Sequence, residues 1–347
     1  MHITGTIRVF CTAILVVVQN AMSASDDCPD IWIGKSGGEL VRAIADTHTP
    51  LQYFNRFDGE GGIFEILKIT DGNQDGTAYV NHFSHEHIQF GKNGGAPENL
   101  ELLNIASPKW WKITSPNCKN VGMDLLGMIP APSGTAATIG DCAPGTVTEF
   151  EIQNGIWGVG SGNVGLQKIR LWEPPEELKG DIARILMYMA CIYSSGLMRY
   201  ETCGGAIWSD NPEEGFTGAY GAQLMVWHKA DPISHYEIQR NLLFGKLQGN
   251  SNPFVEYPEL AEFLWGNRKG EGYKPSEEHM STLRAVYSMD DPLIHLRLDL
   301  VPDDAVWKVD GQTVTEKYLV PAEIGVGIHE LYFYSSSFNG MIKIEVK

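Results

Sequence analysis

The stretch Lys179-Gly-Asp-Ile-Ala-Arg-Ile-Leu-Met-Tyr-Met-Ala190 decides the fold, and its pattern continues to Tyr193. Its apolar residues recur at helical spacing and form one stripe, made of Ile182, Ile185, Leu186, Met189 and Ile192. Aspartate is among the residue types that cap helix N-termini, and Asp181 stands just before the stripe. We therefore predict an amphipathic helix that begins at Asp181 and buries one face.

Three other segments also predict helices. Leu40, Val41, Ile44 and Ala45 are spaced helically within Gly37–Asp46, and a second pattern starts over Gln223–His228. A third helix is predicted over Ser234–Leu247, where Ser234 and Glu237 have the spacing of a capping box. It stops at the turn-forming residues Gly249-Asn-Ser-Asn-Pro253.

Between residues 50 and 175 the chain is rich in glycine, with short apolar runs and many turn signals. This composition favours loops and short strands. Gly158-Val-Gly-Ser-Gly162 lacks the glycine spacing of a nucleotide-binding loop, and we expect a turn there. Asp71-Gly-Asn-Gln-Asp-Gly76 resembles the start of a calcium loop, but the twelfth position is His82, which favours an acidic turn.

The composition changes after Gly266, where residues 267–284 are predicted to be a linker. Apolar residues then alternate over Leu293–Leu300, Val306–Val314 and His329–Tyr334, the pattern of strands with one buried face. Asp310-Gly311 and Asn339-Gly340 are hairpin turn signals. Residues 285–347 therefore predict a small C-terminal β-sheet module.

Residues 1–24 are expected to be a signal peptide. Arg8 precedes the apolar run Val9–Val18, and small residues follow it. The run is too short for a good membrane span, and no later stretch qualifies, so we expect no transmembrane segment in the mature chain. The sequence thus predicts a protein secreted to the extracellular space or the periplasm.

Composition limits the class of protein further. Of the 347 residues, 43 are acidic and 26 are basic, which gives a net charge of −17. Hydrophobic residues make up 43% of the chain. Such a chain builds real cores, which excludes wholesale disorder. The negative charge repels polyanions and argues against broad, sequence-independent capture of nucleic acid.

Five cysteines remain after residue 24, and none forms a CxxC motif, so a structural zinc site has no support. In an oxidising compartment Cys118–Cys142 and Cys191–Cys203 are plausible disulfides, because each closes a short stretch of chain. The sequence leaves the pairing open, and the odd number leaves at least one thiol or an intermolecular bond.

His82, His85, Glu86 and His87 form a cluster of candidate functional residues. Three imidazoles and one carboxylate within six positions suit a divalent metal, or a general base beside a metal-binding carboxylate. The alternative is a polar hairpin with exposed histidines.

Lys179–Ala190, His228–Asn241 and Lys246–Val255 together resemble the bacterial endonuclease I family, and the resemblance extends over about residues 34–266. It implies an α+β fold, with an endonuclease I-like domain of the His-Me finger (ββα-metal) type over residues 28–266. It also implies cleavage of DNA or RNA with a divalent metal, Mg²⁺ or Ca²⁺. The family's site holds a Glu-His pair, in which histidine is the general base, and a downstream metal-binding Asn.

Two alignments place that Glu-His pair differently. In the first, His87 is the general base, and the candidate metal ligands are Glu86, Asp141, His85 and His82. If the chain is active, the candidate contacts with nucleic acid are Lys109, Arg170 and Arg184. The second matches Ser107–Trp111 to the family and puts Asn104 and Ile105 at the pair. Whichever alignment is chosen, Leu126 and Gly127 replace a polar pair in the segment Asp124–Pro130, and Ala136 stands where the family has its metal-binding Asn.

We prefer the second alignment, because it matches more residues on both sides and needs no unusual gap. It predicts a secreted protein on a nuclease scaffold without the ordinary hydrolytic mechanism, which serves an extracellular partner by binding or structure. The first alignment predicts a live endonuclease whose partner is nucleic acid. A third hypothesis is zinc or copper capture by His82, His85 and His87.

Overall fold

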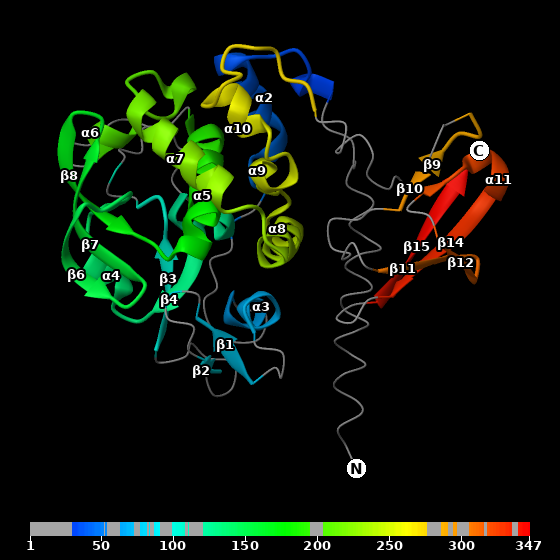
Figure 1. Ribbon diagram of the computed structural model, residues 1–347, viewed down its shortest axis with the longest axis horizontal. Coiled ribbons are helices and arrows are strands. Elements are labelled where there is room, and N and C mark those ends of the chain that lie inside the picture. The colour runs from blue at the N-terminus through cyan, green and yellow to red at the C-terminus, as the bar shows by residue number, and fades with distance from the viewer. Residues whose placement is uncertain are drawn as a thin grey trace. The chain divides into compact units, whose positions relative to one another are not determined.

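The computed structural model describes residues 30–51, 53, 63–72, 77–81, 83, 87–90, 99–107, 110, 121–194, 204–275, 286–290, 294–296, 305–315, 318–334 and 339–347 (Figure 1). They divide into two compact units, Ile31–Lys274 and Pro275–Lys347. The division falls within residues 267–284, which composition predicts as a linker. The predicted signal peptide, residues 1–24, lies outside the described residues.

Helix α5 (Lys179–Ile192) is the centre of the first unit. It packs against α2 (Gly37–His48), α7 (Gly218–Ala230) and α9 (Pro253–Glu256). Helix α8 (His235–Gln248) contacts α9 and α3 (Ile63–Thr70), and α10 (Leu260–Leu264) also contacts α9. A short helix, α6, spans Gly204–Ile207. The helices predicted over Gly37–Asp46, Gln223–His228 and Ser234–Leu247 are thereby confirmed as α2, α7 and α8.

The predicted start and buried face of α5 were wrong. Every residue of the helix is buried, and the chain enters it from the 3₁₀ turn Glu176–Leu178, so that Leu178 and not Asp181 stands at the N-cap. The Asp231 carboxylate instead satisfies the helix start, accepting a hydrogen bond from the Gly180 N–H at 2.8 Å. The helix is surrounded on all sides, and its polar side chains are paired inside the protein, which one apolar stripe does not reveal.

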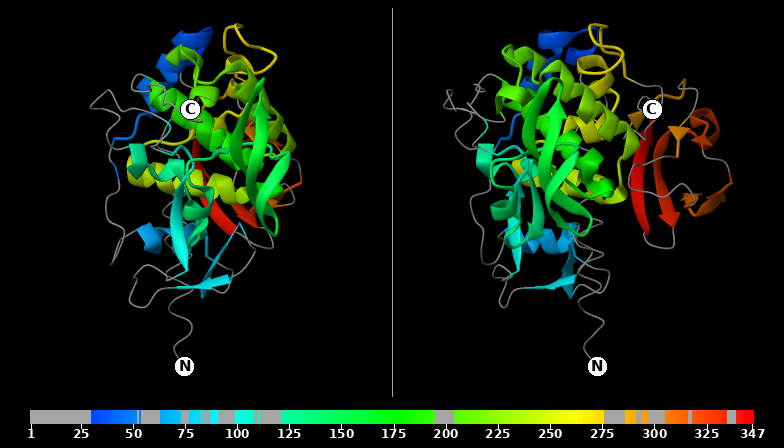
Figure 2. Two further views of the ribbon diagram at one scale, coloured as in Figure 1. Left: turned by 90° about the vertical axis from the view of Figure 1, so that its left-hand side faces the viewer. Right: turned by 60° about the vertical axis from the view of Figure 1, so that its left-hand side comes forward.

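Short strands confirm the expectation for residues 50–175. Strands β1 (Ala78–Val80) and β2 (His87–Gln89) form a hairpin, and β3 (Leu100–Asn104) pairs antiparallel with β4 (Met128–Pro132). A four-stranded sheet has the order β5-β8-β7-β6, with bounds Ala143–Pro144, Gln167–Glu173, Trp157–Val164 and Glu149–Asn154. Figure 2 (left) shows β6, β7 and β8 side by side in front of the helices. The fold is a mixture of helices and sheets, of the α+β class.

Gly158–Gly162 lies in strand β7, so the predicted turn was wrong. A Cβ atom at Gly158 would lie 2.6 Å from the Ile152 carbonyl oxygen and 2.7 Å from an atom of the Phe150 ring. At Gly162 it would lie 2.7 Å from a methyl group of Leu171. These glycines therefore allow close approach of neighbouring strands, a role that in sequence looks like turn formation.

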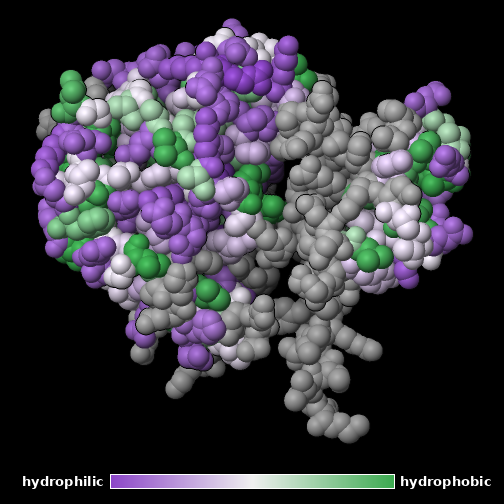
Figure 3. Space-filling model, in the orientation of Figure 1, coloured by the Kyte–Doolittle hydropathy of each residue, from purple (hydrophilic) through white to green (hydrophobic). Residues whose placement is uncertain are grey.

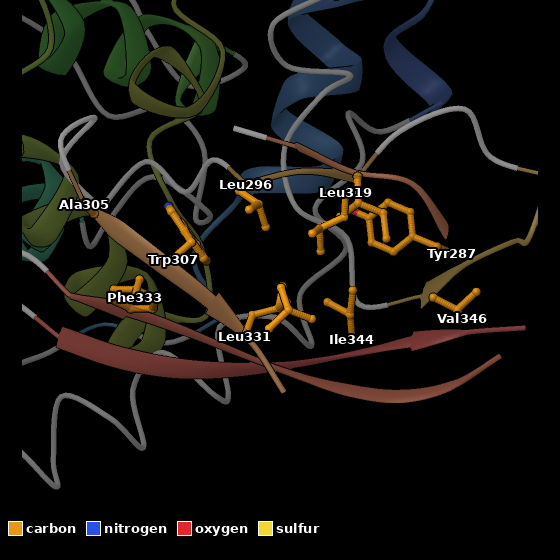
Figure 4. Close-up of a cluster of buried hydrophobic side chains, with 11 residues drawn as sticks. Tyr287, Leu296, Ala305, Trp307, Leu319, Leu331, Phe333, Ile344 and Val346 are labelled. Atoms are coloured by element: carbon orange, nitrogen blue, oxygen red, sulfur yellow. The ribbon is translucent and has the colours of Figure 1, made fainter. Parts of the chain in front are cut away.

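The second unit is a five-stranded sheet of order β12-β11-β14-β15-β9. The bounds are Gln312–Val314, Val306–Val309, Gly327–Tyr334, Asn339–Val346 and Val286–Tyr287. A small pair, β10 (Ile294–His295) and β13 (Tyr318–Leu319), and the short helix α11 (Pro321–Ile324) accompany it. Figure 4 shows its core, in which Trp307, Leu331, Phe333 and Ile344 are buried.

One of the two predicted hairpin turns is confirmed. Asp310 (φ 48°) and Gly311 (φ 85°) connect β11 to β12, and both have the positive φ that a tight hairpin turn requires. Asn339-Gly340 instead begins strand β15, opposite Tyr334 and Phe333, so that prediction was wrong. The pairing of long strands overrode a local turn preference.

In the orientation of Figure 3, hydrophilic residues cover most of the first unit and hydrophobic residues are scattered among them. Within the part of the chain that the structure describes, no helix has the length and apolar character needed to cross a membrane. Cys142 and Cys191 are buried and carry free thiols, so the predicted pairs Cys118–Cys142 and Cys191–Cys203 are absent from this structure. Cys118 and Cys203 lie outside the described residues.

Candidate functional site

Strands β3 and β4 and the short helix α4 (Thr135–Ile139) form a strand-strand-helix motif. Asn104 lies opposite Met128 at one end of the strand pair. The chain then turns at Gly134, whose φ of 93° suits glycine, and α4 contacts β3. The Glu101 carboxylate accepts a hydrogen bond from the Ala136 N–H at 2.6 Å, which satisfies one of the free N–H groups at the helix start.

Ile105 and Gly127 meet directly at the end of this strand pair. The Ile105 N–H donates to the Gly127 carbonyl oxygen at 3.0 Å. Ile105 is 1% exposed, and Leu126 is 5% exposed. The motif therefore presents apolar, buried side chains at these positions, and neither carries a group that binds metal or transfers a proton.

Asp124 holds the segment that leads into β4. Its carboxylate accepts hydrogen bonds from Tyr193 Oη at 2.6 Å, Tyr188 Oη at 2.7 Å and Gln248 Nε2 at 2.9 Å. It also accepts the Leu126 N–H at 3.0 Å. Burial raises the pKa of the Asp124 carboxyl, while the bonds from Gln248, Tyr193 and Tyr188 favour its ionised form.

The buried polar residues Gln248 and Asn250 extend this network. Gln248 Oε1 accepts the Leu125 N–H at 2.7 Å, and Asn250 Nδ2 donates to Tyr188 Oη at 2.7 Å and to the His48 carbonyl oxygen at 2.8 Å. The sequence marks these positions as a family element without showing their partners. The structure indicates that they fix the backbone around Leu125 and Leu126.

Arg184 is at the centre of a second buried network. Its guanidinium makes two bonds to the Glu237 carboxylate, at 2.6 and 2.7 Å, one to Asp181 at 3.1 Å and one to the Asp231 carbonyl oxygen at 2.9 Å. The side chain is 0% exposed. It has no surface to offer a polyanion, and the predicted contact with nucleic acid is wrong for this residue.

The Ser234–Glu237 capping box forms only in part. The Glu237 N–H donates to Ser234 Oγ at 3.1 Å, but the Glu237 carboxylate binds Arg184 and does not return to the helix start. The spacing thus located the helix correctly. The ionic role of Glu237 was missed, because its partner lies 53 positions away.

The other predicted site residues lie on separate elements. His87 is exposed at the start of β2, opposite Val80, and Asp141 is exposed just after α4. Arg170 is exposed on β8 and pairs with Glu151 at 3.1 Å. Four further candidates, His82, His85, Glu86 and Lys109, lie outside the described residues. Over the described ranges, no group of three or more His, Cys, Asp and Glu side chains is placed to hold a metal ion.

The helices around α5 and the buried residues Gln248, Asn250 and Asn252 lie in the segments that carry the resemblance found in the sequence, and the fold is of the α+β class. The model of the endonuclease I family matches residues 71–259, which is more than half of the 347 residues. The chain belongs to the endonuclease I family.

Several known nucleases share a segment with this chain. The extracellular ribonuclease of Bacillus subtilis (strain 168) is 38% identical over 100 residues, 27% of this chain and 32% of that protein. The extracellular deoxyribonuclease of Aeromonas hydrophila is 32% identical over 90 residues, 26% of this chain and 31% of that protein. Endonuclease-1 of Buchnera aphidicola is 29% identical over 102 residues, 29% and 34% of the two chains. The similarity thus spans about a third of the length of each relative.

Proposed function

We propose that this chain is a secreted member of the endonuclease I family that has lost the family's ordinary hydrolytic site and acts by binding or structure. One observation carries the proposal. The hydrogen bond between the Ile105 N–H and the Gly127 carbonyl oxygen joins the two segments that the second alignment matches to the family's site. With Ile105 at the histidine position, no imidazole is available there to activate water.

The same positions do not fit a divalent metal. Among Asn104, Ile105 and Ala136, only Asn104 has a side chain with a donor atom, whereas Mg²⁺ and Ca²⁺ require several oxygen ligands. The nearby Glu101 carboxylate already accepts the Ala136 N–H. We therefore derive no metal-dependent step at this motif.

The location outside the cell rests on two supports. The sequence begins with the pattern of a signal peptide, and two similar nucleases from Bacillus subtilis and Aeromonas hydrophila are named as extracellular. A net charge of −17 keeps a secreted protein soluble and weakens its attraction to polyanions. This charge favours an extracellular partner other than bulk nucleic acid.

The second candidate function is metal-dependent cleavage of DNA or RNA with His87 as general base and Glu86 and Asp141 on Mg²⁺ or Ca²⁺. The names of the similar proteins, ribonuclease and deoxyribonuclease, favour it. The exposure of His87 on β2 leaves its imidazole accessible to substrate. Metal capture by His82, His85 and His87 uses the same segment and would appear as zinc or copper binding that triple alanine substitution abolishes.

Plasmid nicking and RNA degradation by the mature chain separate the two candidates. The assays contain Mg²⁺, Ca²⁺ or Mn²⁺, or a chelator, and compare the wild type with His87→Ala. Gln89→Ala is the matched control, because Gln89 is exposed two positions further along the same strand. Circular dichroism shows that each protein is folded.

We expect no cutting with any metal from the folded wild type. Chelator-sensitive cutting that persists in Gln89→Ala and disappears in His87→Ala would establish the second candidate and overturn the first. Cutting that survives His87→Ala but not chelation would overturn both assignments of the site.

A further inference from the structure

The five-stranded sheet of the second unit has one face turned away from its core. Along β14, His329, Leu331 and Phe333 are buried, and the alternate residues Ile328, Glu330, Tyr332 and Tyr334 lie on the opposite face. Strand pairing brings residues of β11 and β15 to this same face, with Lys308 opposite Tyr332 and Lys343 opposite Glu330. The sheet therefore has an outer face of mixed aromatic and charged side chains.

Two tyrosines lie next to each other on this outer face. Tyr332 and Tyr334 are two positions apart on β14, and Tyr334 is 43% exposed. The Lys308 ammonium lies 5.4 Å from the centre of the Tyr334 ring. Tyrosine combines a large apolar ring with a polar end, which makes it effective in contact surfaces that stay wet.

Carboxylates border the tyrosines and are held in place. Glu330 accepts hydrogen bonds from Tyr332 Oη at 2.8 Å and from Lys343 Nζ at 2.9 Å. Asp310 pairs with His329 Nδ1 at 2.8 Å and accepts the Glu330 N–H at 2.8 Å. Each carboxylate has about four acceptor positions, so both keep capacity for further donors.

Several of these side chains line a shallow, open depression of about 630 Å³ on the outer face. The residues that line it are Lys308, Asp310, Gly311, Ile328, Glu330, Tyr332 and Tyr334.

The charges of this face balance and leave no excess of positive charge to attract a polyanion. The cations Lys308 and Lys343 are balanced by the anions Asp310 and Glu330, and the whole chain is strongly acidic. A neutral ligand with many hydroxyl groups fits this balance. Its hydroxyls donate to the carboxylates, and the C–H faces of its rings stack on the tyrosines.

We propose that the outer face of β11 and β14 binds a neutral polysaccharide of β-1,4-linked hexoses, with sugar rings stacked on Tyr332 and Tyr334. The extended, ribbon-like shape of such a chain suits the open face of a sheet better than the coiled shape of an α-linked chain. Binding gives the second unit an attachment function, which is independent of whether the first unit cuts nucleic acid.

The test is isothermal titration calorimetry of the full mature chain with cellohexaose, with maltohexaose as the α-linked comparison. Tyr332→Ala and Tyr334→Ala each remove one stacking surface. Tyr318→Ala is the matched control, because Tyr318 is also 43% exposed and is not among the residues that line the depression. Circular dichroism of each variant verifies the fold.

We expect cellohexaose to bind, affinity to fall about tenfold or more in each of the two variants, and Tyr318→Ala to bind like the wild type. The absence of cellohexaose binding up to about 10 mM would overturn the proposal. It would also be overturned if both tyrosine variants kept full affinity, if maltohexaose bound equally well, or if duplex DNA displaced the sugar.

Discussion

Tyr188 Oη donates a hydrogen bond of 2.7 Å to the buried carboxylate of Asp124, across a sequence separation of 64 positions. This bond connects the centre of α5 to the turn that leads into β4. The same hydroxyl accepts a hydrogen bond from Asn250 Nδ2 at 2.7 Å. One tyrosine thus links α5, the segment before β4 and the residues that follow α8.

Tyr188→Phe removes a donor from Asp124 and leaves the Asn250 amide with one partner fewer. Because both groups are buried, we expect the free energy of unfolding to fall by about 1–3 kcal/mol. Urea unfolding followed by tryptophan fluorescence measures this loss. Every tryptophan except Trp307 belongs to the first unit, so the signal reports on that unit.

The control for this variant is Val226→Ala on α7, where the side chain is 65% exposed. Its free energy of unfolding is expected to stay within about 0.5 kcal/mol of that of the wild type. Equal effects of the two substitutions would show that the Asp124 network contributes nothing specific to stability.

Arg184→Met is expected to destabilise the first unit by about 3–5 kcal/mol, because it leaves the buried Glu237 carboxylate without its partner. The double variant Arg184→Met with Glu237→Met is expected to be more stable than Arg184→Met alone. The second substitution removes the cost of the unpaired Glu237 charge, whereas Asp181 lacks Arg184 in both variants. The measurement is a double-mutant cycle of urea unfolding.

The cycle has a clear contrary result. If the destabilisation in the double variant equals the sum of the two single effects, the two side chains are not coupled. The pairing of Arg184 with Glu237 would then contribute nothing to the free energy of unfolding.

Local patterns predicted the helices well and the polar networks poorly. Helices α2, α7 and α8 could be predicted because the spacing of apolar residues, and for α8 the capping Ser234, are visible within a few neighbouring residues. Glu237, the carboxylate that binds Arg184 twice, lies 53 positions from it, and the side chains that bind Asp124 lie 64 or more positions away, so nothing in the local sequence identifies these partners. Arg184 was therefore interpreted as a surface cation, although it is buried.

The candidate site could be predicted in part for the same reason. The residues Asp124–Pro130 match a segment of the family. Counting on from Pro130 places Ala136 at the position where the family has its metal-binding Asn. The pairing of β3 with β4, and hence the contact between Ile105 and Gly127, depends on tertiary structure. Sequence spacing alone leaves two alignments open, and the choice of the second remains our proposal.

Stability is expected to depend on pH through His228. Burial lowers the pKa of its imidazole to about 4, and the charge of Arg184 acts in the same direction. Between pH 6.5 and 4 the unfolded chain binds a proton that the folded protein does not, so the free energy of unfolding decreases as the pH falls. The loss for this group is up to about 3 kcal/mol.

His228→Gln is expected to lose less stability than the wild type between pH 6.5 and 4, as measured by urea unfolding at several pH values. Asp181 acts in the opposite direction, because burial and the charge of Glu237 raise the pKa of its carboxyl. Because Asp181 is present in both proteins, the difference between their free energies of unfolding reports on His228. Parallel curves for the two proteins would contradict the prediction.

Two glycines of the first unit should respond oppositely to the same change. In Gly158→Ala the new methyl group would lie 2.6 Å from the Ile152 carbonyl oxygen and 2.7 Å from an atom of the Phe150 ring. Strands β6 and β7 must then move apart, at a cost of about 1–3 kcal/mol.

Gly218 begins α7, and no neighbouring atom outside the helix backbone lies within 4 Å of its Cβ position. There alanine favours the helix and narrows the unfolded ensemble, so Gly218→Ala should be neutral or stabilise by up to about 1 kcal/mol. Thermal unfolding of both variants checks the contrast, and a Gly158→Ala protein as stable as the wild type would show that the strand glycines are not required for packing.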